Sequence, residues 1–169
     1  HTLDTSNGKI AKLSPYAEGD FTASWHERRT LSRARAVAFT DDGKQIAFVA
    51  GQDLYVMDRI LREPKRITNT PAIEGSLCFA DDGKRLCFTS EDSGEAEIWE
   101  ATCSQEDGIW WMAEEFSLRK VTDDRGVEGG LNPSPTGEHI AYVKGADLWV
   151  MDKDGSDPRR VIQSWDAPR

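Results

Sequence analysis

The chain has 169 residues, of which 30 are acidic and 21 are basic, and its formal net charge at pH 7 is −9. This acidic balance argues against a nucleic-acid partner, because phosphate binding needs a basic face. No stretch approaches the roughly 18 consecutive apolar residues of a membrane-spanning helix, and the first residues do not show the pattern of a signal peptide.

An internal repeat is the strongest indication of the fold. Residues 36–58, AVAFTDDGKQIAFVAGQDLYVMD, align without a gap on residues 130–152, GLNPSPTGEHIAYVKGADLWVMD. Residues 75–90, GSLCFADDGKRLCFTS, form a middle copy. Repetition over this length indicates a repeat architecture and outweighs any single residue as evidence.

The first copy shows what one repeat would form. Residues 41–44, Asp-Asp-Gly-Lys, are typical of a hairpin turn, since Asp bonds nearby amides and Gly accepts positive φ. The apolar segment 45–50 indicates an inner strand, 53–58 a third strand, and the more polar 65–68 an outer strand. Helices are excluded because Gly and Asp-Gly turns interrupt every window. Four antiparallel strands per repeat of roughly 40 to 50 residues are typical of a propeller blade.

We therefore predict an all-β chain of β-propeller blades with four antiparallel strands each, in an incomplete ring of three full blades plus partial blades at both ends. In chain order the segments are the third and fourth strands of a preceding blade (1–14), a connecting loop (15–34), blade one (35–68), blade two (74–122) with an insertion (102–116), blade three (128–163) and the start of a next blade (164–169).

Three details of this arrangement can be predicted further. Pro133 and Pro135 should shorten the first strand of blade three, because proline cannot donate to a ladder. The insertion at 102–116 should extend the hairpin of blade two outward. Propellers close with four to eight blades, so three blades should leave an apolar face uncovered. We expect either self-association into a homo-oligomer that completes a ring or further blades in a longer chain.

The candidate partner contacts are three tryptophans, because aromatic residues are frequent interface anchors. Trp25 lies in the polar connecting loop, and Trp110 and Trp111 lie in the insertion. The alternative for the Trp110–Trp111 pair is that it covers the edge of the blade. Ser24 and His26 are close in sequence, but spacing alone does not make a catalytic pair, and no catalytic residue is predicted.

Cys78, Cys87 and Cys103 are too few and odd in number for a disulfide framework. If residues 81–84 form a hairpin turn, Cys78 and Cys87 face each other on adjacent strands. Their slots hold alanines in the first copy, which favours small buried thiols over a disulfide. No metal or cofactor site is predicted, since no His or further Cys stands at ligand spacing. His139 falls on an exposed strand position.

The repeat resembles those of TolB-type and tricorn-type β-propellers. The resemblance rests on the blade motifs at 40–44, 80–84 and 134–138 and on the strands Asp53–Asp58 and Asp147–Asp152. The insertion with Trp110–Trp111 and the segment 164–168, Ser-Trp-Asp-Ala-Pro, also look like the propeller part of bacterial tricorn-like serine peptidases. In that family the catalytic residues lie in a separate domain, so none can be carried over to this chain.

The resemblance implies a leading hypothesis and one alternative. The leading hypothesis is a non-catalytic propeller fragment of a tricorn-like peptidase that acts as scaffold and peptide gate beside the remaining propeller and protease domains. The alternative is a TolB-like periplasmic module that binds a protein partner. A propeller enzyme acting on glycans would need two converging carboxylates, and Asp58 and Asp152 occupy equivalent slots. The family resemblance also implies a periplasmic or secreted location.

Overall fold

The computed structural model describes residues 2–3, 10–11, 30, 32–105, 108–123 and 125–164. The chain divides into two compact units, residues 1–30 and residues 31–169. In the first unit, β1 (Thr2–Leu3) pairs antiparallel with β2 (Ile10–Ala11). That these two strands belong to a preceding blade stays a prediction.

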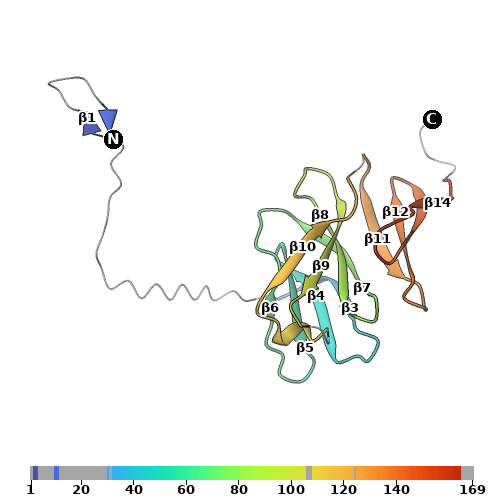
Figure 1. Cartoon of the computed structure of the whole chain (residues 1–169), viewed down its shortest axis with the longest axis horizontal. Helices are drawn as coiled ribbons and strands as arrows, with labels where there is room; N and C mark the ends of the chain where they lie inside the picture. Colours follow the sequence, from blue (N-terminus) through green and yellow to red (C-terminus); the bar gives the residue numbers. More distant parts are fainter. Residues whose placement is uncertain are drawn as a thin grey trace. The chain divides into compact units, whose positions relative to one another are not determined.

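The second unit contains three antiparallel sheets of four strands each, and in each sheet the strands neighbour one another in chain order (Figure 1). Blade one consists of β3 (Ala34–Phe39), β4 (Gln45–Ala50), β5 (Asp53–Asp58) and β6 (Lys65–Arg66). Blade two consists of β7 (Glu74–Ala80), β8 (Arg85–Ser90), β9 (Glu97–Cys103) and β10 (Phe116–Lys120). Blade three consists of β11 (Glu128–Pro133), β12 (His139–Lys144), β13 (Asp147–Asp152) and β14 (Arg159–Ile162).

The turns between the first two strands of blades one and two share the residues Asp-Asp-Gly but differ in the residue before them. In blade one, Thr40 donates its hydroxyl to Asp42 at 2.7 Å, and Asp42 also accepts the amide of Lys44 at 3.0 Å. These bonds, the one from Thr40 first, lower the pKa of Asp42 to about 2. Blade two has Ala80 in place of threonine, and there Asp81 and Asp82 both adopt positive φ. The same three residues thus form two different turns.

The first strand of blade three is not shortened, so that prediction is wrong. β11 has six residues, the same number as β3. Pro133 is its last residue, and Pro135 falls in the following turn. Both prolines therefore lie where a missing amide costs little. A register shift between Gly129 and Asn132 marks the irregular part of the strand.

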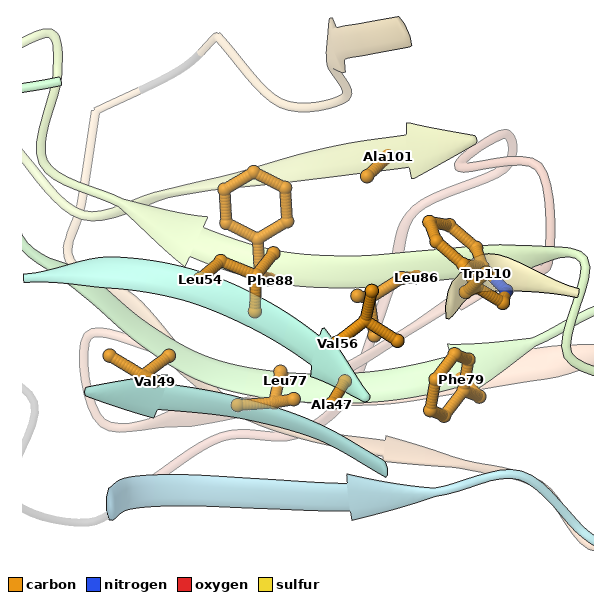
Figure 2. Packing of buried hydrophobic residues seen from close by; sticks show 10 residues of the cluster. All are labelled: Ala47, Val49, Leu54, Val56, Leu77, Phe79, Leu86, Phe88, Ala101 and Trp110. Atoms are coloured by element: carbon orange, nitrogen blue, oxygen red, sulfur yellow. The ribbon is translucent and has the colours of Figure 1, made fainter. Parts of the chain in front are cut away.

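Two apolar clusters join the blades in chain order, so that blade two lies between blades one and three. Figure 2 shows the cluster between blades one and two, where side chains of β4 and β5 point toward those of β7 and β8. Its members are Ala47, Val49, Leu54, Val56, Leu77, Phe79, Leu86, Phe88, Ala101 and Trp110. The second cluster lies between blades two and three and includes Cys78, Cys87, Ile98, Leu131, Ile140, Tyr142 and Met151.

A threonine after the outer strand adds a polar connection at both junctions. The hydroxyl of Thr68 accepts the amide of Leu54 at 2.8 Å, and that of Thr122 accepts the amide of Ile98 at 2.9 Å. Thr122 also donates to Glu128, the first residue of the next blade. Its counterpart Glu74 lies beside Thr68. We call this arrangement the Thr–Glu connection.

Cys78 and Cys87 are register partners on β7 and β8, as predicted. Both thiols are free and buried, with exposed fractions of 3% and 1%. The hydrogen bond with Cys78 and burial raise the pKa of the Cys87 thiol well above its ordinary value. Cys103 is free and half-buried. Over the described residues no helix is long and apolar enough to span a membrane.

Candidate functional site

The sequence predicts Trp25, Trp110 and Trp111 as partner contacts. Trp25 lies outside the described residues, as do its neighbours Ser24 and His26. Trp110 and Trp111 begin η1 (Trp110–Met112), a single 3-10 turn within the insertion of blade two. The structure gives these two adjacent residues different environments.

Trp110 is fully buried and anchors the insertion in the core. Its ring stacks on Phe116 with ring centres 6.0 Å apart, and it meets Phe79 edge-on at 5.9 Å. The indole Nε1 donates to the carbonyl of Gly83 at 2.6 Å. Trp110 therefore provides no exposed anchor for a partner, and the alternative of a residue that covers the blade describes it better.

The insertion is bonded to blade one as well as to its own blade. The Gln45 side chain accepts the amide of Trp110 at 2.7 Å and donates to the carbonyl of Gly108 at 2.8 Å. Lys65 donates to the carbonyl of Ala113. Beyond the paired strands β9 and β10 the insertion thus folds over blade one, and it does not extend the hairpin outward as predicted. Its position is set by blades one and two together.

Trp111 lines a groove of about 330 Å³ between the insertion and blade one. Its side chain is half-buried, so part of the ring remains available to a ligand. The other lining residues are Asp58, Leu61, Glu63, Pro64 and Lys65. An aromatic ring beside apolar and charged side chains, on a support fixed by Trp110, can act as an anchor for a partner. We call this surface the Trp111 groove.

Asp58 and Asp152 lie on different blades, and each is hydrogen-bonded within its own blade, so they are not a carboxylate pair. Asp58 is buried and accepts the amides of Ile60 and Leu61 at 2.5 and 2.8 Å. Asp152 lies 3.0 Å from Nδ1 of His139, whose side chain is 46% exposed. His139 is half-buried on β12, whereas an exposed position was expected for it. The geometry explains a turn at Asp58 and a side-chain hydrogen bond at Asp152 without catalysis.

The acid that begins each third strand has a structural partner on the outer strand. Asp53 lies 3.7 Å from Arg66, Glu97 lies 2.7 Å from Lys120, and Asp147 lies 3.0 Å from Arg160. The amide of Ser164, followed by Arg160, lowers the pKa of Asp147. Repeated ion pairs account for these acids. Within the described part of the chain, no group of three His, Cys, Asp or Glu residues could hold a metal ion.

A second candidate surface is the outward face of blade one, which carries an open apolar groove of about 480 Å³. Phe39 and Val37 are 56% and 48% exposed there. The remaining lining residues are Ser32, Arg33, Ala34, Ile46, Phe48, Ala50, Met57, Arg62 and Pro64. The sequence predicts that some apolar blade face is uncovered, but it does not name these residues. Comparing the burial of equivalent positions in the three copies identifies them.

Comparison with known protein families finds no match. Over 107 residues the chain is 29% identical to the Tol-Pal system protein TolB of Anaeromyxobacter dehalogenans. The matched region covers 61% of this chain and 21% of that protein. The crystal structure of TolB from Acinetobacter baumannii matches with a TM-score of 0.59 and 22% identity, over 78% of this chain and 32% of that one. The tricorn protease matches with a TM-score of 0.55 and 17% identity, over 80% and 13% of the two chains.

These similarities confirm the predicted fold class. The chain has a TolB-like β-propeller fold, with three blades and no closed ring among the described residues. TolB proteins supply the match in sequence and the higher of the two structural scores, whereas tricorn protease is a structural neighbour. The chain spans 21% of the length of its curated relative.

Proposed function

We propose that the chain is a TolB-like interaction module that binds a protein partner through the Trp111 groove. The observation that carries this proposal is the contrast between adjacent tryptophans, in which Trp110 is buried as a support and Trp111 is half-buried with part of its ring accessible. Rigid placement of an aromatic ring lowers the entropy lost on binding. The similarity to TolB proteins supports the same choice of function and favours a periplasmic location.

The groove favours a partner segment with an apolar and a basic side chain. Leu61 and Pro64 offer apolar surface beside Trp111, and Glu63 is an exposed acid at the same groove. A lysine or arginine of the partner can lie over the indole face and pair with this carboxylate. The net charge of −9 would also speed the approach of a basic partner.

Selection of peptides displayed on phage against the intact chain tests this proposal. The selected peptides should share one motif with a basic and an apolar residue. The Trp111→Ala variant should lose at least about tenfold in affinity for them, as expected for an aromatic anchor. The control is Met112→Ala, which removes a neighbouring side chain that is 52% exposed. Equal binding to wild type and Trp111→Ala would exclude this groove as the site.

A second candidate is a scaffold and peptide gate of a tricorn-like serine peptidase, which the structural match to tricorn protease favours. The same selection separates the two functions. A gate admits peptides of many sequences with weak affinity, whereas an interaction module selects a single motif. Recovery of diverse, weakly bound peptides would favour the gate. Hydrolysis of peptides by this chain alone would contradict both proposals.

A further inference from the structure

The junction between blades one and two defines two kinds of blade face. Blade one contributes its following face, which we define as Ala47, Val49, Leu54 and Val56. Blade two contributes its preceding face, which we define as Leu77, Phe79, Leu86 and Phe88. The two faces pack against each other in one cluster (Figure 2). All eight side chains are buried, with exposed fractions of 7% or less.

Blade three repeats the following face of blade one residue for residue. The pair Ala47–Val56 on β4 and β5 corresponds to the pair Ala141–Val150 on β12 and β13. The pair Val49–Leu54 corresponds in the same way to Val143–Leu148. No further blade among the described residues covers this face, and Val143 is 41% exposed where Val49 is fully buried.

Blade one likewise repeats the preceding face of blade two. The register partners Phe39–Ile46 and Val37–Phe48 correspond to Phe79–Leu86 and Leu77–Phe88. Two phenylalanines are kept, and the other two positions exchange one aliphatic side chain for another. Phe39 is 56% exposed, whereas Phe79 is 7% exposed. The open groove of blade one is therefore a close copy of a surface that packs on Ala, Val, Leu and Val within the same molecule.

The polar parts of the two open faces are also compatible. At the start of blade one, Ala34 occupies the position that Glu74 has in blade two, because Ala34 pairs with Ala50 as Glu74 pairs with Ser90. Ile162, opposite Leu148 on β13, ends the outer strand of blade three. The open faces thus lack both the glutamate and the threonine of the Thr–Glu connection. Joining them would therefore not bury a glutamate that has no threonine partner. An unpaired buried carboxylate would oppose such contact, and this pair of faces avoids it.

We propose that the following face of blade three binds the preceding face of blade one in a second copy of this chain. The two faces lie on opposite ends of a three-blade unit, so they cannot meet within it (Figure 1). The three described blades of each of two copies joined head to tail make six blades, which is within the four to eight that close a propeller. The contact is heterologous, so two copies form a closed ring when three blades turn through half of it.

The mass of the intact chain in solution tests the assembly. Light scattering after size exclusion should give a discrete species of twice the 18.9 kDa chain mass. Phe39→Asp and Val143→Asp should each weaken self-association on the order of 100-fold, since each buries a charge in an apolar contact. Both positions are exposed within a single copy, so folding should persist. Ile60→Asp, at a position 82% exposed and outside both faces, is the matched control.

Mixing the two variants separates a head-to-tail contact from a symmetric one. Neither variant alone can form an intact junction. In a mixture, the following face of the Phe39→Asp chain meets the intact preceding face of the Val143→Asp chain, and a species of two chains should reappear. A monomer at all concentrations, a dimer unaffected by either variant, or a mixture that stays monomeric would each overturn the proposal. Open polymers in place of a two-chain species would overturn the ring.

Discussion

The closed junction between blades one and two and the two open blade faces are built from nearly the same residues. Leu54 is fully buried in the junction, whereas its counterpart Leu148 on blade three is only half-buried. The exposed fraction of phenylalanine rises from 7% at Phe79 to 56% at Phe39 in the equivalent slot. The difference in exposure comes from whether a neighbouring blade packs on the face and not from the residue type.

This comparison shows why residue type does not distinguish a folding contact from an association contact in a repeat protein. Each blade buries one face against the blade before it and one against the blade after it, and stability is a sum of such nearest-neighbour terms. At the ends of the unit the same sequence pattern faces solvent. Substitutions at equivalent slots should therefore affect stability in the junction and self-association on the open faces.

The largest difference is expected between Phe79→Ala and Phe39→Ala. Phe79 packs against Trp110 in the junction, and truncating a buried phenylalanine costs about 3–5 kcal/mol of unfolding free energy. Phe39 is 56% exposed, so its truncation should change stability by no more than about 0.5 kcal/mol. Urea denaturation at low protein concentration measures both, since dilution removes any contribution from self-association.

Retention of the aromatic ring supplies the control for this pair. Phe79→Tyr preserves the ring but adds a hydroxyl to an apolar cluster, and Phe39→Tyr places the same hydroxyl on an exposed face. If Phe39→Ala destabilised the dilute chain as much as Phe79→Ala, the open face would have to be covered within a single copy. That result would remove the basis for the head-to-tail contact.

The strands of the blades could be predicted from the sequence because the repeat supplies independent copies of one pattern. The predicted segments 45–50 and 53–58 are the strands β4 and β5. Period and turn chemistry locate a strand well, since each depends on local residues. The pairing of Cys78 with Cys87 follows from the turn for the same reason. The all-β fold class was predictable on these grounds.

The position of the insertion could not be predicted from the sequence, because it is set by contacts between residues that are far apart in the chain. Gln45 binds Trp110 across 65 positions, and no local pattern signals that bond. The adjacent residues Trp110 and Trp111 thus differ in environment, one fully buried and the other half-buried. The prolines of blade three gave a wrong prediction because Pro133 ends β11 without interrupting it. The Thr–Glu connection was missed, although the threonines recur at the same place in blades one and two.

A smaller difference is expected between Val49→Ala and Val143→Ala. Each substitution removes the same two methyl groups from equivalent positions on following faces. At about 0.8 kcal/mol per buried carbon, the loss at the fully buried Val49 is about 2 kcal/mol. Val143 is 41% exposed, so the dilute chain should lose only a little more than half of that. Thermal and urea unfolding of both variants measure the ratio, and equal losses would contradict the difference between the faces.

The Thr–Glu connection gives the next smaller effect. Thr122→Val keeps the shape of the side chain but removes the hydroxyl from Glu128 and leaves the amide of Ile98 only its 3.2 Å bond to Glu128. Loss of a buried hydrogen-bonding partner costs about 1–3 kcal/mol. Ile162→Thr introduces a hydroxyl at the open end, where that side chain is 57% exposed, and should be nearly neutral in the dilute chain. A neutral Thr122→Val would show that the connection does not stabilise the junction.

The smallest expected effect is a pH dependence at Glu74, which lies in the closed junction and has only Ala34 as its counterpart on the open face. Burial raises the pKa of Glu74 above its ordinary value of 4.5, with the hydroxyls of Ser90 and Thr68 partly opposing it. Below pH 4.5 the carboxyl is protonated in both states. As the pH rises above 4.5, Glu74 ionises in the unfolded chain before it ionises in the folded chain. The unfolding free energy therefore falls with rising pH until the pH passes the folded-state pKa of Glu74.

Glu74→Gln keeps the shape of the side chain and removes the titration. Its unfolding free energy relative to wild type should therefore increase as the pH rises above 4.5 and then level off. Urea denaturation over this pH range measures the difference, and the exposed Glu91→Gln controls for the loss of one negative charge. A Glu74→Gln difference that fell with rising pH would mean that the ionised carboxylate is stabilised in the junction. The ionised form would then serve as a polar bond between blades, a bond that the open faces lack.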